Sequence, residues 1–282
     1  ILQAMVANGV IQHESQVEND HIAFRTLGVP NLGIRSLEKI FLHCGYRRRD
    51  AYHFEGKKLD AFWYAPPAAS YPRIFISELR VQDLSIGSQQ VIRSYSDEVA
   101  SDPVDELDLD DGLAVDAFLH QGLWRLPGWT DYKLLAAESE YAAWTIYNRY
   151  YLNHFTISVH NLPSPYDDLE AYNRFLEQTG VRLNDAGGKI KVSPDGLLLQ
   201  SSTVAEMVDA EFYDDDGSVI TRPIAGSYVE FAERRVLPEF AHLPPDELER
   251  QHRREGFEAG NADKIFESTF SSQTGRSSEK AR

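Results

Sequence analysis

Apolar and polar residues alternate strictly in two well-separated stretches of the chain. In DHIAFRT (residues 20–26), Ile22 and Phe24 alternate with a histidine, an alanine and an arginine. In NHFTISVH (residues 153–160), three apolar residues alternate with histidines, a threonine and a serine. A period of two is typical of a strand whose successive side chains point to opposite faces. We therefore predict two half-buried strands, each with a histidine on the face away from its apolar side.

Each alternating stretch is followed by a segment with the periodicity of an amphipathic helix. The first predicted helix lies within SLEKIFLHCG (36–45) and the second within SPYDDLEAYNRFLEQTG (164–180), and each ends at a glycine. Glycine readily adopts the left-handed conformation that terminates a helix. Alternation and turn residues then predict further strands at residues 53–67, 73–80, 187–204 and 226–235.

The same order of elements occurs twice, which predicts a duplicated βαβββ unit. The two predicted helices end in similar sequences, FLHCGYR and FLEQTGVR, and the last strands carry Glu78 and Glu230, which we align as equivalent. Two such modules are expected to form an α+β fold, in which they curl into a half-barrel with their first strands side by side. His21 and His154 would then face one cavity.

The expected organisation is one integrated catalytic domain in four parts. Residues 1–80 form the first module, 81–150 a helical insert and 151–243 the second module. Residues 244–282 are expected to contain a charged surface helix over 244–259 and a disordered tail from Ser268.

Composition narrows the classes of partner. The chain has 282 residues and a net charge of −16, which disfavours nucleic acid and anionic membranes as partners. No apolar run approaches the roughly 20 residues of a membrane span. The single cysteine excludes an internal disulfide and suggests a reducing compartment. An anionic substrate would need a local positive group.

Two histidines on paired strands and a carboxylate on a closing strand are candidate metal ligands. Two imidazoles and one carboxylate on one side of a metal leave open positions opposite, as in the facial triad of non-haem Fe(II) oxygenases. Any one histidine is more often structural, but His21 and His154 occupy matched repeat positions, which favours ligation together with Glu230. Glu78 is the alternative carboxylate, unless it pairs with Arg80.

The motifs DHIAFRT, NHFTI, QSSTVAEMVDAEF and GSYVEFAER resemble the 2-oxoadipate dioxygenase/decarboxylase (hydroxyglutarate synthase) family, formerly DUF1338, over residues 18–240. The resemblance implies a vicinal-oxygen-chelate-type fold and Fe(II) held by His21, His154 and Glu230. It also implies that Arg25 binds the substrate, for which a planar guanidinium suits a carboxylate. The alternative for Arg25 is a structural ion pair with an acidic neighbour such as Asp20.

The implied reaction converts 2-oxoadipate and O2 to 2-hydroxyglutarate and CO2 in lysine catabolism, so that the expected partners are a small 2-oxo diacid and O2. Gln200, Ser201 and Ser202 lie on a strand expected to line the cavity. Their side chains would bind a substrate carboxylate or orient a ligand, or else satisfy the backbone at a strand end.

Two other functions compete with this interpretation. One is a redox-inert lyase or isomerase of the glyoxalase type, with Glu78 as a fourth ligand to a different metal. The other is a metal-free module that only binds a small acid. The chain begins with Ile1, and the family has bacterial members and plastid-targeted plant members, so we expect a soluble intracellular protein, in a plastid rather than the cytoplasm.

Overall fold

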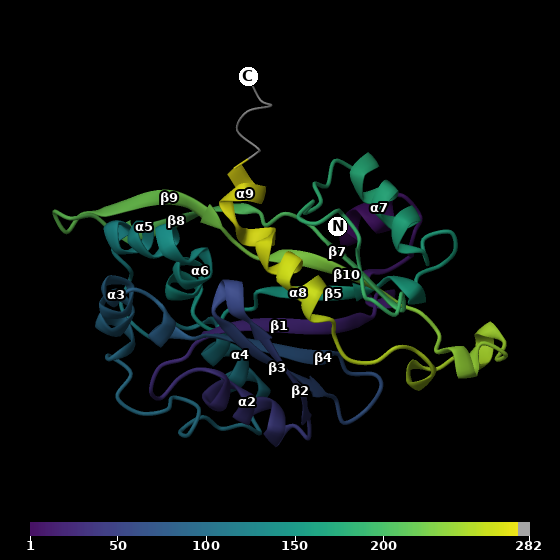
Figure 1. Cartoon of the computed structure of the whole chain (residues 1–282), viewed down its shortest axis with the longest axis horizontal. Helices are drawn as coiled ribbons and strands as arrows, with labels where there is room; N and C mark the ends of the chain where they lie inside the picture. Colours follow the sequence, from purple (N-terminus) through teal and green to yellow (C-terminus); the bar gives the residue numbers. More distant parts are fainter. Residues whose placement is uncertain (276–282) are drawn as a thin grey trace.

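The two alternating stretches form neighbouring strands at the centre of an eight-stranded sheet. In the computed structural model, which describes residues 1–275, β1 (Asn19–Leu27) pairs antiparallel with β5 (His154–Ser158). The sheet order is β2-β3-β4-β1-β5-β10-β7-β6, so each module supplies one half. Figure 1 shows the curved sheet with the two modules side by side. The predicted α+β half-barrel is confirmed.

Each half contains one helix and four strands of this sheet. In the first module, β1 is followed by α2 (Ile34–His43), β2 (Arg47–Phe54), β3 (Leu59–Ala65) and β4 (Arg73–Leu79). In the second, β5 is followed by α7 (Leu169–Gln178), β6 (Lys191–Val192), β7 (Leu198–Ser202) and β10 (Tyr228–Arg234). A two-stranded hairpin, β8 (Met207–Tyr213) and β9 (Val219–Ala225), is inserted before β10.

The segment between the modules is helical, as predicted. It contains α3 (Ile86–Ser96), α4 (Gly112–His120), α5 (Trp129–Glu138) and α6 (Glu140–Asn148). Aromatic residues of this insert, including Trp124 and Tyr141, are buried in the same core as β1, α2 and β4. Trp129 and Tyr132 pack instead on Phe212 of the β8–β9 hairpin. The boundaries assigned to the four parts stay a prediction.

The remaining helices are short and lie at the ends of the chain. They are α1 (Leu2–Ala7), α8 (Ala259–Ile265) and α9 (Ser271–Thr274). None of the helices within residues 1–275 has the length and apolar character needed to cross a bilayer.

A glutamate on each module's last strand binds the start of that module's helix. Glu78 accepts a hydrogen bond from the backbone N–H of Ile34 in α2, at 2.7 Å, and Glu233 accepts one from Leu169 in α7, at 2.9 Å. A carboxylate satisfies the unpaired N–H groups of a helix N-terminus and complements its dipole. Glu233 is therefore the counterpart of Glu78, and our alignment of Glu78 with Glu230 was wrong.

The C-terminal region differs from the prediction. Residues 244–259 form no long helix; they contain two short 3-10 turns, Pro245–Glu247 and Arg250–His252. The chain is folded from Ser268 to Gly275, where Ser268, Thr269, Gln273 and Thr274 are buried. Their polar side chains find partners, as when Ser268 bonds Ser202 and Asn184. The rest of the predicted disordered tail, 276–282, lies outside the described residues.

His160 lies beyond the strand predicted for it, because β5 ends at Ser158 and a 3-10 turn follows. Its Nδ1 lies 3.2 Å from the Arg234 backbone nitrogen and 3.3 Å from the Ala232 carbonyl oxygen, and it accepts from the former in the neutral ring. Burial lowers the pKa of His160 from 6.5 to about 4. This histidine therefore belongs to the packing behind β10 and not to the cluster formed by His154.

We expect His160 to contribute to acid destabilisation. The unfolded chain binds this proton between pH 6.5 and about 4 whereas the folded chain does not. Stability is therefore lost as the pH falls through that window, by up to roughly 3 kcal/mol. Urea unfolding of the wild type should weaken more steeply between these pH values than that of His160→Gln. Equal slopes would contradict this assignment.

Candidate metal centre

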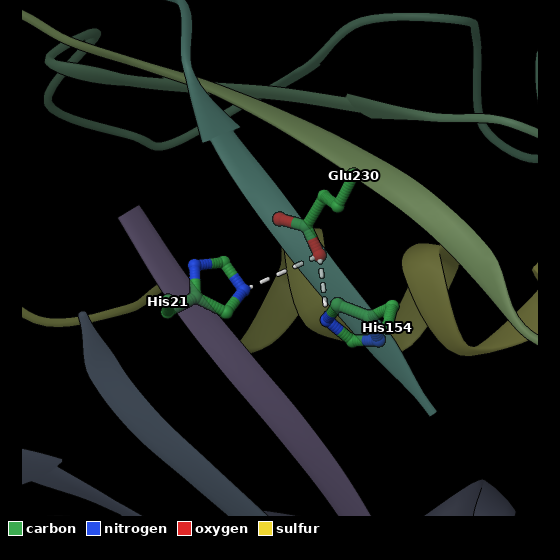
Figure 2. Close-up of side chains that lie close together, drawn as sticks. All are labelled: His21, His154 and Glu230. Atoms are coloured by element: carbon green, nitrogen blue, oxygen red, sulfur yellow. Dashed lines mark ion pairs between the residues drawn. The ribbon is translucent and has the colours of Figure 1, made fainter. Parts of the chain in front are cut away.

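Three buried side chains converge on one point of the concave face. They are His21 from β1, His154 from β5 and Glu230 from β10, and they lie on three adjacent strands. The Oε2 atom of Glu230 is 3.5 Å from Nε2 of His21 and 3.1 Å from Nε2 of His154 (Figure 2). Within residues 1–275, these side chains form the group of potential ligands whose donor atoms all lie within 4.8 Å of one another.

Strand register explains this convergence. On β5, Thr156 is opposite both His21 of β1 and Glu230 of β10, so the three side chains form a row on one face. Side chains of opposed residues on neighbouring strands come within about 5 Å of each other. The first module has a matching row, in which His154 of β5 and Phe75 of β4 are both opposite one alanine of β1. Phe75 therefore takes the place that Glu230 has in the second module. The position equivalent to Glu230 in the first module is therefore apolar.

The separations within the triad suit a metal ion. Ligand atoms bound at right angles, each about 2.1 Å from a metal, lie about 3 Å apart. The two nitrogen-to-oxygen distances of 3.5 and 3.1 Å are close to this value. Two imidazoles and one carboxylate are the donor set of a facial triad, which leaves open positions for substrate.

The protonation states also favour a cation at this point. Although burial alone would raise the pKa of Glu230, His21 and His154 lower it to about 2, so the carboxylate is an anion. Burial lowers the pKa of His154 and favours its neutral form. Burial also acts to lower the pKa of His21, but Glu230 and Asp20 raise it overall. A bound cation would replace the proton that His21 otherwise attracts.

Each histidine is oriented by the residue immediately before it. Nδ1 of His21 is 2.8 Å from a carboxylate oxygen of Asp20, and Nδ1 of His154 is 3.0 Å from the amide oxygen of Asn153. Both contacts make Nδ1 the donor, which leaves Nε2, the nitrogen nearer Glu230, as the atom of each neutral ring that can bind a metal ion. Sequence reasoning missed this role, although the repeated pairs Asp-His and Asn-His were the available signal.

Asp20 is itself held by two buried arginines. Its carboxylate accepts hydrogen bonds from Arg73 at 3.0 Å and from Arg234 at 2.5 and 2.9 Å. Burial opposes ionisation of Asp20, but these guanidinium groups lower its pKa well below the usual value. Arg25 is not among its partners, so the predicted alternative of an Arg25–Asp20 ion pair is wrong.

Comparison with known proteins identifies the family. The family model described as 2-oxoadipate dioxygenase/decarboxylase matches residues 2–242. This chain belongs to the 2-oxoadipate dioxygenase/decarboxylase family.

The family relatives match along most of the chain. The protein named 2-oxoadipate dioxygenase/decarboxylase, chloroplastic, of Arabidopsis thaliana is 46% identical over 274 residues, covering 93% of this chain and 71% of that protein. The crystal structure of hydroxyglutarate synthase in complex with 2-oxoadipate from Oryza sativa is also 46% identical, with a TM-score of 0.84 over 92% of this chain and 83% of that one.

A more distant structure shares the fold. A glyoxalase-superfamily protein from Ralstonia eutropha is 22% identical, with a TM-score of 0.69 over 92% of this chain and 81% of that one. At this identity the match concerns architecture alone. Together these matches confirm both the predicted family and the predicted fold class.

In this dioxygenase/decarboxylase family member, the C-terminal segment covers the candidate metal centre. Phe257, Ala262, Ile265 and Phe266 line a cavity together with the three candidate ligands. Figure 1 shows α8, in yellow, crossing the concave face of the sheet. The cavity has a free volume of about 20 Å³, which is room for about one water molecule. These covering residues follow the region that the family model matches.

Arg25 lies next to the C-terminal segment that covers the site, and its side chain is only 1% exposed. The guanidinium faces the rings of Tyr141 and Trp144 at 4.9 and 5.1 Å. It donates hydrogen bonds to the hydroxyl of Thr269 and the carbonyl of Phe266, while its Nε atom has no partner. No carboxylate within residues 1–275 lies at ion-pair distance from it, so Arg25 is a buried cation without a matching anion.

The three candidates on β7 divide between the two faces of the strand. Gln200 lines the cavity and donates a hydrogen bond to Oε1 of Glu230 at 2.6 Å, so it orients the carboxylate. Ser202 bonds Ser268 of the C-terminal segment. Ser201 points to the opposite face and donates to Asn173 of α7. The structure therefore does not bring Ser201 to the cavity, because successive strand residues alternate between faces.

Proposed function

We propose that this chain is a non-haem iron(II) enzyme that converts 2-oxoadipate and O2 to 2-hydroxyglutarate and CO2, a step of lysine catabolism. The observation that carries the proposal is the buried His21–His154–Glu230 cluster in a chain of the 2-oxoadipate dioxygenase/decarboxylase family. The reaction balances, since the one carbon that is lost leaves as CO2 and both atoms of O2 enter the products.

Iron(II) is the metal that this reaction class and donor set favour. An iron bound by His21, His154 and Glu230 would supply the activation of O2, and the 2-oxo acid itself would supply the electrons that reduce O2. The apolar Phe75 at the position equivalent to Glu230 favours three protein ligands over four. Glu78, the fourth ligand that a glyoxalase-type reaction would need, is instead bonded to the start of α2.

The protein's own residues would position the substrate and keep the site dry. Arg25 lies on the same face of β1 as His21, roughly 13 Å further along the strand. Its unpaired charge suits the distal carboxylate of a diacid whose 2-oxo end lies at the metal. The aromatic rings around Arg25 exclude water, which strengthens that interaction.

For the substrate to enter, the C-terminal segment that covers the site must move. The free volume of about 20 Å³ cannot hold a six-carbon acid. The segment around Phe266 and Thr269 must therefore shift from Arg25 when substrate binds, which would free the guanidinium for the substrate carboxylate. We extend the proposal to location: the Arabidopsis relative is named as chloroplastic, which favours a plastid.

Oxygen uptake by the anaerobically Fe(II)-loaded protein tests the proposed function. We expect uptake with 2-oxoadipate, matched one-to-one by CO2 and 2-hydroxyglutarate, and much slower uptake with 2-oxoglutarate, pyruvate or 4-hydroxyphenylpyruvate. The protein loaded with Zn(II) should consume no oxygen. If the iron-loaded protein consumes no oxygen with any of the four acids, the proposed reaction is wrong.

A further inference from the structure

Two buried polar atoms beside the candidate metal centre make no hydrogen bond of good geometry. They are Nε of Arg25 and the hydroxyl oxygen of Tyr228. Tyr228 lines the cavity and is 4% exposed. The Arg25 guanidinium faces the Trp144 ring at 5.1 Å, and Trp144 belongs to the same buried cluster as Tyr228, so the two groups lie in one aromatic cage.

Strand register places Tyr228 between the metal centre and Arg25. It is opposite His154 on the neighbouring strand, and the two rings stack with centroids 4.5 Å apart and planes 27° apart. Its ring therefore contacts a candidate ligand, and Arg25 lies two residues beyond Ala23, the residue of β1 that is opposite His154.

The unpaired hydroxyl is exceptional among neighbouring buried tyrosines. Tyr141, which also contacts Arg25, has its hydroxyl bonded to Ser77 and Thr26, and the Tyr150 hydroxyl accepts a hydrogen bond from the backbone N–H of Gly33 before α2. Leaving a buried donor unpaired is costly. Two such donors in one aromatic cage indicate a site where the acceptor atoms of a ligand bind.

We propose that the Tyr228 hydroxyl and Arg25 Nε together bind the distal carboxylate of the substrate, which makes Tyr228 a residue that selects diacids over monoacids. A carboxylate offers two acceptor oxygens in one plane, one for each donor. This inference rests on the proposed function, because it assumes that a 2-oxo diacid is bound with its oxo end at the metal.

The test is Tyr228→Phe, which keeps the ring that stacks on His154 and removes only the hydroxyl. We expect KM for 2-oxoadipate to rise about tenfold or more. KM for 2-oxohexanoate, which has a methyl group in place of the distal carboxylate, should change less than about twofold. Calorimetric titration of the metal-loaded protein with 2-oxoadipate, without oxygen, should show the same increase in Kd, and iron content should be unchanged.

A matched control is Tyr172→Phe, which removes a buried hydroxyl bonded only to the sulfur of Met5 in the other core. It should leave both KM values unchanged. If Tyr228→Phe raises KM for the two acids equally, or lowers iron content, Tyr228 supports His154 and our inference is wrong. An unchanged KM for the diacid would also overturn it.

The anaerobic titration separates this inference from the proposed reaction. If the wild type binds 2-oxoadipate but consumes no oxygen, the reaction fails while the difference in Kd between wild type and Tyr228→Phe still decides the role of Tyr228. If the wild type does not bind 2-oxoadipate at all, both proposals fall.

Discussion

Replacing Glu230 with glutamine is expected to abolish stable iron binding and, with it, oxygen uptake on 2-oxoadipate. Glutamine keeps the size of the side chain and its contact with Gln200 but loses the negative charge that two imidazoles cannot replace. We expect iron affinity to fall by about a hundredfold or more. Metal analysis after anaerobic loading and dialysis measures this directly.

The structure offers a matched control for this substitution in Glu78→Gln. Glu78 lies on the corresponding last strand of the other module, but its carboxylate binds the start of α2. This variant should keep its iron and its activity and lose only about 1 kcal/mol of unfolding free energy. Full iron occupancy in Glu230→Gln would remove Glu230 from the ligand set.

Replacing Arg25 with alanine should raise KM for 2-oxoadipate by about a hundredfold and leave KM for 2-oxohexanoate within a few-fold of the wild type. The reason is that Arg25 is a buried cation whose hydrogen bonds go to a neutral hydroxyl and a carbonyl. A substrate carboxylate would supply the missing anion. Steady-state oxygen uptake with the two acids gives both values.

Arg25→Lys separates charge from shape. Lysine keeps the positive charge but lacks the planar fork, so we expect only partial recovery of the diacid preference. Thermal unfolding of both variants checks that the aromatic cage around residue 25 still folds. Equal increases in KM for the diacid and the monoacid in Arg25→Ala would show that Arg25 does not bind the distal carboxylate.

Some features of this site follow from local sequence. Alternation over residues 20–26 and 153–160 is enough to place His21 and His154 on comparable faces of two strands, because the period of a strand depends on backbone geometry alone. The repeated strand–helix order then predicts that the two strands are equivalent.

The register between strands could not be predicted from these local patterns. The sequence suggests that Glu78 and Glu230 are equivalent, since each lies on the last strand of its module. Only the pairing shows that Glu233 shares the capping role of Glu78, whereas Glu230 faces the two histidines. A shift of three residues in the alignment therefore exchanges a helix-capping glutamate for a candidate metal ligand, because different positions on a strand face different surroundings.

Local periodicity and short patterns were enough to predict the duplicated modules, the two histidines and the family. The tertiary structure decided which partners each group acquires: Asp20 binds Arg73 and Arg234, and Arg25 lies beneath Phe266. These contacts join residues distant in the chain, and no local pattern records them. For the same reason the polar C-terminal segment looks like a solvated tail in the sequence. Its hydrogen-bond partners, Gln200 and Ser202, lie on β7, and only the folded sheet brings them next to it.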